Sequence, residues 1–150
     1  MKVHEILNPH VHSCGTDLDL AQAGALVGSA GWGWLPVVDG GGRVTGVISD
    51  RLICRAVSDR HKRAEQLLVA DVMSPEVTMC REDDEVAAVL RRMASEHVRR
   101  LPVVDAMGVL RGTLSLDDIL LAYEEGRGDL PKRSVVDALR AVRGGAKPGA

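Results

Sequence analysis

Apolar residues recur at helical spacing in the second half of the chain. Between positions 86 and 93 they occupy i, i+3, i+4 and i+7, which places them on one face of a helix. The acidic residues 83–85 directly precede this stretch, and negative charge is favourable at a helix N-terminus. A further helix is predicted over residues 115–123.

Between these two predicted helices the pattern becomes extended. Leu101–Val104 is a continuous apolar run that predicts a buried strand, and residues 109–114 predict a second strand. The turn-forming residues 105–108 join the two as a hairpin. With a short strand expected around Val77, the order of elements is β-α-β-β-α.

The first half of the chain repeats this pattern. The sequence Leu-Pro-Val-Val-Asp at 35–39 recurs at 101–105, an offset of 66 residues. The same offset, without a gap, relates Pro9 to Pro75, Cys14 to Cys80, Gly46 to Gly112, Ser49 to Ser115 and Ile53 to Ile119. We infer a tandem duplication, with a helix at 17–30 and a strand at 35–38 in the first copy.

Composition indicates an ordinary globular protein and narrows its function. The 150 residues are 45% hydrophobic, and 19 basic and 21 acidic residues give a net charge of −2. The aromatic residues are Trp32, Trp34 and Tyr123, and there is no Phe. This near-neutral charge and the scarcity of aromatic side chains exclude a general nucleic-acid-binding surface.

An uncharged stretch from Leu20 to Val38 has about the length of a membrane span. The equivalent part of the second copy contains Arg91, Arg92 and Glu96, so no membrane span is expected in either copy. The N-terminus lacks the basic-then-apolar order of a secretory signal, and the three cysteines form no CxxC pair. These features predict a cytoplasmic protein with reduced thiols.

The two copies resemble a known family. Each has Leu-Pro-Val-Val-Asp, a hairpin, and Gly-x-x-Ser opening a helix, and together they resemble a tandem pair of CBS domains, the family named after cystathionine β-synthase. Such a pair is called a Bateman module, and the resemblance covers residues 3–123. It implies an α+β fold of two β-α-β-β-α CBS repeats that are related by a pseudo-twofold axis and form one compact module. It also implies clefts between the copies that bind adenosine-containing ligands, and pairing of modules into dimers.

The chain is divided accordingly. A polar stretch separates the repeats, an amphipathic pattern at 134–142 predicts a short helix, and the end is rich in Gly, Lys and Pro. The expected parts are CBS repeat 1 at 1–60, a connector at 61–68, CBS repeat 2 at 69–125, a C-terminal segment with the short helix at 126–143, and a disordered tail at 144–150.

The resemblance also implies ligand-binding residues in the second copy. Ser115 and Asp118 match a Ser/Thr-x-x-Asp pattern, in which the hydroxyl and the helix N–H groups attract phosphate and the carboxylate accepts from ribose hydroxyls. Arg99 and Arg100 correspond to a basic pair that reaches phosphate across the interface from the other copy. The same Ser-x-x-Asp spacing is also that of a capping box, which satisfies helix N–H groups without a ligand.

The first copy departs from this pattern. Ser49 is retained and is also assigned to ligand binding, but Leu52 stands in place of the aspartate and Gly33–Trp34 in place of the arginines. The expected ligand contacts are therefore split between the copies. In the second copy, Gly112 within the strand before Ser115 predicts either a close backbone approach or a β-bulge.

Together these features predict a stand-alone regulatory CBS pair. It would bind AMP, ATP, S-adenosylmethionine or a similar ligand in the inter-repeat cleft, and signal through a homodimer or a regulated protein partner. No cofactor is required for this role. The sequence contains no Walker loop, HExxH or GxSxG motif, so an enzyme is not expected.

Two alternatives stay open. The first is a ligand-independent interaction or dimerisation module that uses the uncharged first helix with Trp32 and Trp34, because aromatic residues are enriched at interfaces. The second is a metal- or redox-responsive protein in which His10, His12 and Cys14 share one face of a strand. Because no fourth ligand is specified, no metal site is assigned.

Overall fold

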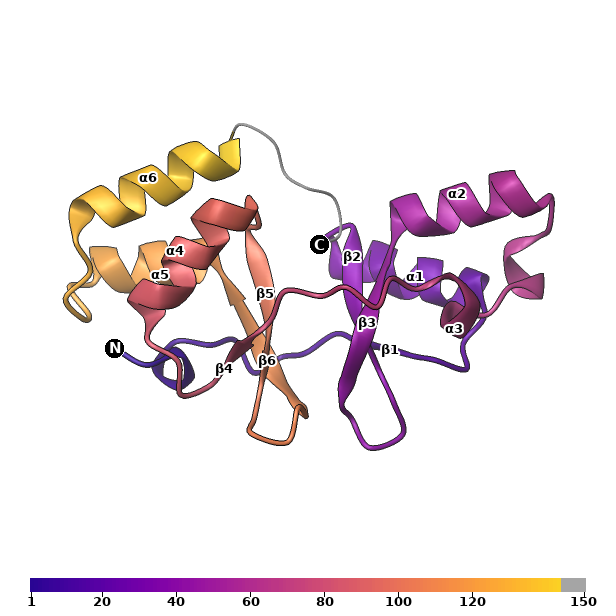
Figure 1. Cartoon of the computed structure of the whole chain (residues 1–150), viewed down its shortest axis with the longest axis horizontal. Coiled ribbons are helices and arrows are strands. Elements are labelled where there is room, and N and C mark those ends of the chain that lie inside the picture. The colour runs from indigo at the N-terminus through magenta and orange to yellow at the C-terminus, as the bar shows by residue number, and fades with distance from the viewer. Residues whose placement is uncertain (144–150) are drawn as a thin grey trace. The chain divides into compact units, whose positions relative to one another are not determined.

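Two three-stranded sheets with their own helices make up residues 1–143, the part of the chain that the structure describes (Figure 1). The structure is a computed structural model of the whole chain. Each sheet belongs to one repeat and follows the order β-α-β-β-α, which confirms the predicted α+β fold with two repeats. The tail predicted at 144–150 lies outside the described residues.

The first repeat forms a sheet with the strand order β1-β2-β3. The parallel pair β1–β2 requires a crossover connection, which α1 supplies, while β2 and β3 form an antiparallel hairpin. Helix α1 begins with a capping box between Asp19 and Gln22 and ends at Gly31 in the left-handed conformation. The elements are β1 (Cys14–Gly15), α1 (Leu20–Ala30), β2 (Trp34–Val38), β3 (Val44–Ser49) and α2 (Asp50–Arg60).

The second repeat has the same topology, with the strand order β4-β5-β6. The predicted apolar face of its first helix is confirmed, since Val86, Val89, Leu90 and Met93 are all fully buried. They belong to a core that also contains Leu101, Leu114 and Ile119. The elements are β4 (Cys80–Arg81), α4 (Val86–Glu96), β5 (Arg100–Val104), β6 (Leu110–Ser115) and α5 (Leu116–Glu124).

Two predicted strands begin later in the chain than expected. Residue 77 has no regular structure, and the first strand of this repeat begins only at Cys80, where parallel pairing with Val103 and Val104 becomes available. In the first repeat, residues 10–13 likewise have no regular structure, and β1 begins at Cys14. Alternation of side-chain types was therefore insufficient to form a strand where no neighbouring strand offers hydrogen bonds.

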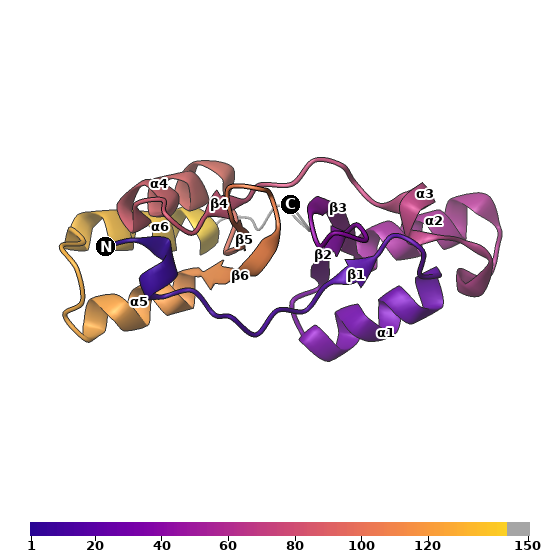
Figure 2. The ribbon, with the colours of Figure 1, turned by 90° about the horizontal axis from the view of Figure 1, so that it is seen from below.

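The segment before each repeat packs into the unit of the other repeat. One compact unit combines residues 1–11 with 78–143, and the other spans 12–77. The Val3 N–H donates to the Asp84 carbonyl at 3.0 Å, and the Val69 N–H, 66 residues later, donates to the Leu18 carbonyl at 2.9 Å. Figure 1 shows the N-terminal helical turn next to the segment that joins β4 to α4, and Figure 2 shows the same turn from below. These segments contain η1 (Val3–Glu5), η2 (Ala64–Gln66) and α3 (Val69–Val72).

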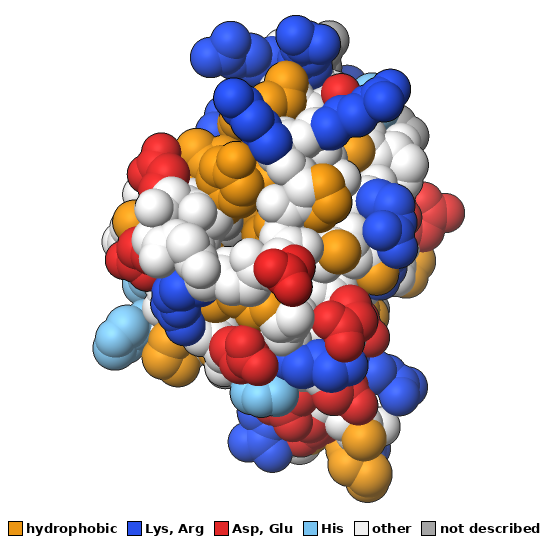
Figure 3. All heavy atoms as spheres, turned by 90° about the vertical axis from the view of Figure 1, so that its left-hand side faces the viewer, with side chains coloured by type: hydrophobic (Ala, Val, Ile, Leu, Met, Phe, Trp, Pro, Cys, Tyr) orange, Lys and Arg blue, Asp and Glu red, His pale blue; other side chains and the backbone are white. Residues whose placement is uncertain are grey.

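A C-terminal helix covers part of the second repeat. The short helix predicted at 134–142 is α6 (Lys132–Arg143), and it packs against α4 through its buried residues Val135, Ala138 and Val142. At the end of α4, the ring nitrogen Nδ1 of His97 lies 2.9 Å from the Ala141 carbonyl oxygen. The outer face of α6 is basic, and Figure 3 shows Lys and Arg side chains gathered at the height of this helix.

Replacing Gly28 by alanine is expected to stabilise the protein. Gly28 lies inside α1, has a negative φ, and a Cβ built there meets no atom within 4 Å. Alanine in a helix interior is favoured over glycine by about 0.5–1 kcal/mol. Urea unfolding followed by the fluorescence of Trp32 and Trp34, which belong to the same unit, measures the gain. Gly31→Ala is the control, because its φ of +73° makes a loss the expected result. An unchanged or lower stability of Gly28→Ala would contradict an open α1 surface.

Candidate functional site

Four predicted ligand-binding residues meet at one end of the second sheet. The register of β5 and β6 places Arg100 opposite Ser115, where α5 begins. The Leu116 N–H also donates to the Arg99 carbonyl at 2.8 Å, so the backbone fixes the arginines beside the helix start. The arginines and this serine thus belong to the same repeat.

Ser115 and Asp118 form a capping box. The Ser115 Oγ accepts from the Asp118 N–H at 3.1 Å, and the Asp118 Oδ2 accepts from the Ser115 N–H at 2.8 Å and from its hydroxyl at 2.6 Å. Ser115 is buried, with 4% of its surface exposed. The second carboxylate oxygen of Asp118, Oδ1, has no hydrogen-bond donor among the described residues.

The charges at this end of the sheet are closely coupled. Burial lowers the pKa of the Arg100 guanidinium, while the negative charges of Asp118 and Asp117 oppose this effect. Arg99 forms an exposed ion pair with Asp117, with 3.8 Å between Nη2 and Oδ1. Sequence reasoning missed Asp117 as a partner of Arg99, although its position next to Asp118 could have indicated it. Two guanidinium groups and the Asp118 carboxylate therefore lie at one helix N-terminus.

The equivalent position in the first repeat is simpler. Ser49 is buried and caps α2 by accepting from the Leu52 N–H at 3.1 Å, as Ser115 caps α5. Since Leu52 replaces the aspartate, the residue at this position offers the serine hydroxyl no carboxylate. Trp34, opposite Ser49 in the β2–β3 register, takes the place of Arg100. Of the five predicted residues, Ser49 is the one that belongs to the unit spanning residues 12–77.

Gly112 permits a close approach by the chain itself. The Asn8 N–H donates to the Thr113 carbonyl at 2.8 Å, and a Cβ on Gly112 would lie 2.5 Å from the Asn8 carbonyl oxygen. A register irregularity between Val103 and Val104 also faces this part of β6. Gly112 therefore has both predicted features, a close backbone approach and a neighbouring β-bulge, and the backbone that approaches it is the N-terminal segment.

The two alternative hypotheses rest on residues around the first sheet. His12 packs edge-on against Trp32, with 5.7 Å between ring centroids, and Trp32 lies 6.1 Å from Trp34. Cys14 is fully buried in the sheet. Within residues 1–143, no group of three or more His, Cys, Asp or Glu side chains is arranged to hold a metal ion.

The uncharged stretch at 20–38 divides into two short elements. Helix α1 contains 11 residues, and after a turn β2 continues the chain. Among the described residues, no helix has the length and apolar character needed to cross a bilayer.

Comparison with known proteins assigns the repeat architecture to a family. The CBS domain model matches residues 3–59 and again residues 69–125. Inosine-5'-monophosphate dehydrogenase of Methanocaldococcus jannaschii is 32% identical over 139 residues, which is 91% of this chain and 27% of that protein. The magnesium transporter MgtE of Thermus thermophilus is 37% identical over 116 residues, which is 77% of this chain and 24% of that protein.

Solved structures agree with this assignment. The CBS domain pair of protein MJ0100, in complex with 5'-methylthioadenosine and S-adenosyl-L-methionine, superposes with a TM-score of 0.67 at 22% identity, covering 85% of this chain and 98% of that one. The cytosolic domain of the Mg²⁺ channel MgtE in complex with ATP gives a TM-score of 0.66 at 26% identity, covering 81% and 48%. The fold is thus a tandem pair of β-α-β-β-α repeats, and the chain belongs to the CBS domain family. It spans about a quarter of the length of the two curated relatives.

Proposed function

We propose that this chain is a regulatory module that binds an adenosine-containing ligand through Ser115, Asp118, Arg99 and Arg100. The observation that carries the proposal is their convergence at the start of α5. The Oδ1 atom of Asp118 would accept from ribose hydroxyls, and the guanidinium groups would bind phosphate or carboxylate oxygens. MJ0100 binds two adenosyl compounds and the MgtE domain binds ATP, which supports this ligand class. Ser49 is proposed as a further contact from the first repeat.

Signalling would follow from linkage. A ligand shifts a conformational equilibrium only if it binds one state more tightly than the other. The proposed output is a change in a homodimer or in the contact with a regulated protein, and the proposed location is the cytoplasm. In this role the chain regulates and does not itself catalyse a reaction.

Adenosyl ligands are expected to raise the thermal stability, and Asp118→Asn is expected to abolish most of that effect. Ligand at 100 times its Kd stabilises a folded protein by about 2.7 kcal/mol. Asparagine keeps a carbonyl oxygen for the Ser115 N–H but removes the charge that ribose hydroxyls meet. The measurement is thermal shift and calorimetry with AMP, ATP and S-adenosylmethionine, with each variant compared with its own ligand-free form.

Two further variants make this test specific. Asp117→Asn is the charge-matched comparison: its side chain is 74% exposed and belongs to no cap, so the ligand response should be retained. Because Asp117 pairs with Arg99, its loss should leave the binding of phosphate-bearing ligands unchanged or tighter, never weaker. Arg100→Ala should weaken AMP and ATP but leave adenosine almost unchanged. If no adenosyl compound shifts the melting temperature and the protein still forms dimers, the ligand-independent interaction module is the better explanation.

A further inference from the structure

A second concave site lies at the opposite end of the same sheet. A cavity of about 380 Å³ is lined by residues of β4, α4 and the β5–β6 turn, among them Arg81, Asp84 and Arg92. Val104, at the end of β5, forms part of its wall. Ser115 lies opposite Arg100 at the start of β5, and four strand residues at about 3.3 Å each separate the two ends by roughly 13 Å. This cavity is therefore distinct from the proposed adenosyl site.

Comparison of the two repeats shows which residues of this cavity wall are common to both copies and which occur only in the second. Cys80, Val104, Asp105 and Gly108 have identical counterparts 66 residues earlier. The counterparts of Arg81, Asp84 and Arg92 are Gly15, Leu18 and Leu26. The first repeat forms the same sheet and helices without these charges. The three charged side chains are therefore specific to the second repeat.

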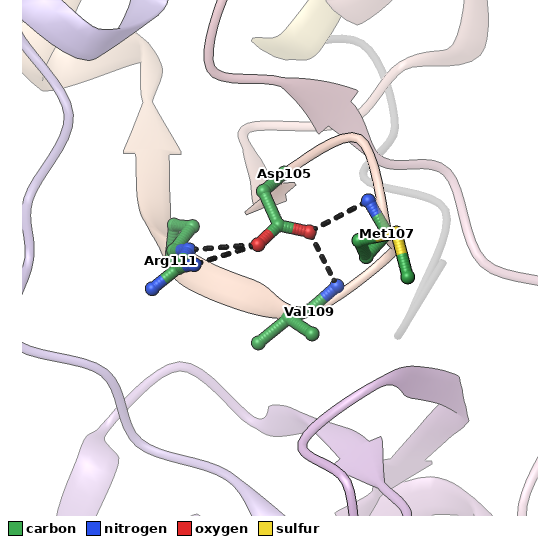
Figure 4. Close-up of polar contacts among 4 residues, drawn as sticks. All are labelled: Asp105, Met107, Val109 and Arg111. Carbon is green, nitrogen blue, oxygen red and sulfur yellow. Dashed lines mark hydrogen bonds and ion pairs between the residues drawn. The ribbon is translucent and has the colours of Figure 1, made fainter.

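Asp105 is fully occupied by structural contacts. Its Oδ1 accepts from the Met107 N–H at 2.8 Å and from the Val109 N–H at 3.0 Å, which closes the turn (Figure 4). Its Oδ2 accepts from Arg111 through Nη2 at 2.7 Å and Nε at 3.0 Å. Burial raises the pKa of this carboxyl, but the Val109 N–H, Arg111 and the Met107 N–H together lower it below its usual value. Asp105 thus shapes the wall without offering a free charge.

The three repeat-specific charges are not neutralised by one another. In residues 1–143 no ion pair within 4.0 Å joins Asp84 to Arg81 or to Arg92. The Asp84 Oδ2 accepts from the Arg81 backbone N–H at 2.9 Å, while its Oδ1 has no donor in this part of the chain. Arg92 has one distant ion-pair contact, at 4.0 Å from Nε to Glu96 on its own helix.

Two of the three charges, those of Asp84 and Arg92, act on the same buried thiol in the wall, and Arg81 lines the same cavity. The Cys80 thiol, 2% exposed, has a pKa raised to about 12 by burial first and by Asp84 second, while Arg92 lowers it. Opposite charges that face one cavity without pairing are complementary to a molecule that carries both charges. Guanidinium groups bind carboxylates in forked geometry, and a carboxylate accepts hydrogen bonds from an ammonium group.

We propose that this cavity binds a free α-amino acid, with its carboxylate on Arg92 and Arg81 and its ammonium group on Asp84. The volume falls within the range of small-molecule pockets, about 300–1,000 Å³. Met79 and Val104 supply the apolar wall for the amino acid side chain. This site goes beyond the proposed adenosyl site and shares no residue with it, so the module would respond to a second class of ligand.

The test is a titration of the ¹⁵N-labelled full chain with each of the common L-amino acids at millimolar concentration. The backbone amides of Arg81, Met107 and Val109 are expected to shift on binding. The amine and the deaminated acid derived from the best amino acid should bind about tenfold more weakly or worse, because each lacks one charged contact. No shift at these amides with any amino acid would overturn the proposal, and so would equal binding of either analogue.

Variants taken from the first repeat locate the site. Arg92→Leu introduces the residue found at the equivalent Leu26 and should weaken binding about tenfold or more, while Asp84→Asn should remove the discrimination against the deaminated acid. Arg91→Ala, exposed and outside the cavity wall, is the matched control and should bind as the parent does. Binding that survives Arg92→Leu contradicts the proposal. The response to adenosyl ligands should be unchanged in Arg92→Leu, so the two sites succeed or fail separately.

Discussion

Gly112→Ala is expected to destabilise the unit formed by residues 1–11 and 78–143 by about 3 kcal/mol. The new Cβ would lie 2.5 Å from the carbonyl oxygen of Asn8 and 2.5 Å from a methyl group of Leu7. A backbone oxygen cannot move aside as a flexible side chain can, so the N-terminal segment must leave the sheet. The hydrogen bonds that Asn8 and Thr113 exchange at 2.8 and 3.0 Å would then be lost. Urea unfolding followed by circular dichroism measures the loss.

The location of the damage distinguishes this mechanism from a general effect of the substitution. Hydrogen exchange at the Val3 and His4 amides, which are bound to Asp84 and Glu82, should accelerate most. Gly40→Ala is the control, because no atom lies within 4 Å of its built Cβ and the second repeat has Ala106 at this position. A Gly112→Ala protein as stable as Gly40→Ala would show that the N-terminal segment does not pack on β6.

Local patterns were sufficient to predict most elements of each repeat. The helical spacing at 86–93 predicted the buried face of α4, because that face packs on the sheet of its own repeat. The run at 101–104 and the turn after it predicted the β5–β6 hairpin for the same reason. In each case elements of the same repeat supply part of the core that buries the pattern.

The exchange of the segments before the repeats could not be predicted in this way. Val3 and Val69 are equivalent and both fully buried, yet each packs in the unit of the other repeat. Hydrophobic pattern shows that a residue is buried but not which of two similar cores receives it. Gly46 and Gly112 carried the available signal, since a glycine retained in both strands indicates a backbone crossing.

The candidate site was only partly predictable. The spacing of Ser115 and Asp118 is common to a capping box and to a nucleoside site, and the structure shows that the cap is present. What the spacing could not show is that one carboxylate oxygen has no donor within residues 1–143 and that Arg100 lies opposite Ser115. That neighbourhood depends on strand register, which follows from the folded hairpin.

Stability is expected to fall steeply above about pH 9 because of two buried thiols. Burial raises the pKa of Cys14 from 9.0 to about 11, and burial, with a smaller contribution from Asp84, raises that of Cys80 to about 12. Below about pH 9 both thiols are neutral in the folded and unfolded chains, so they leave the stability unchanged. Above it the unfolded chain loses these protons first, and each thiol lowers the free energy of unfolding by roughly 1 kcal/mol per pH unit until its folded pKa is reached.

Cysteine variants measured in urea, under reducing conditions, separate this effect from other alkaline titrations. Cys80→Ala and Cys14→Ala should each lose roughly half of the thiol-dependent slope of stability against pH, whatever their stability at neutral pH. Cys54→Ala is the matched control, because Cys54 is exposed on α2 and should leave the slope unchanged. Equal slopes in Cys80→Ala and Cys54→Ala would mean that the Cys80 thiol is accessible to water.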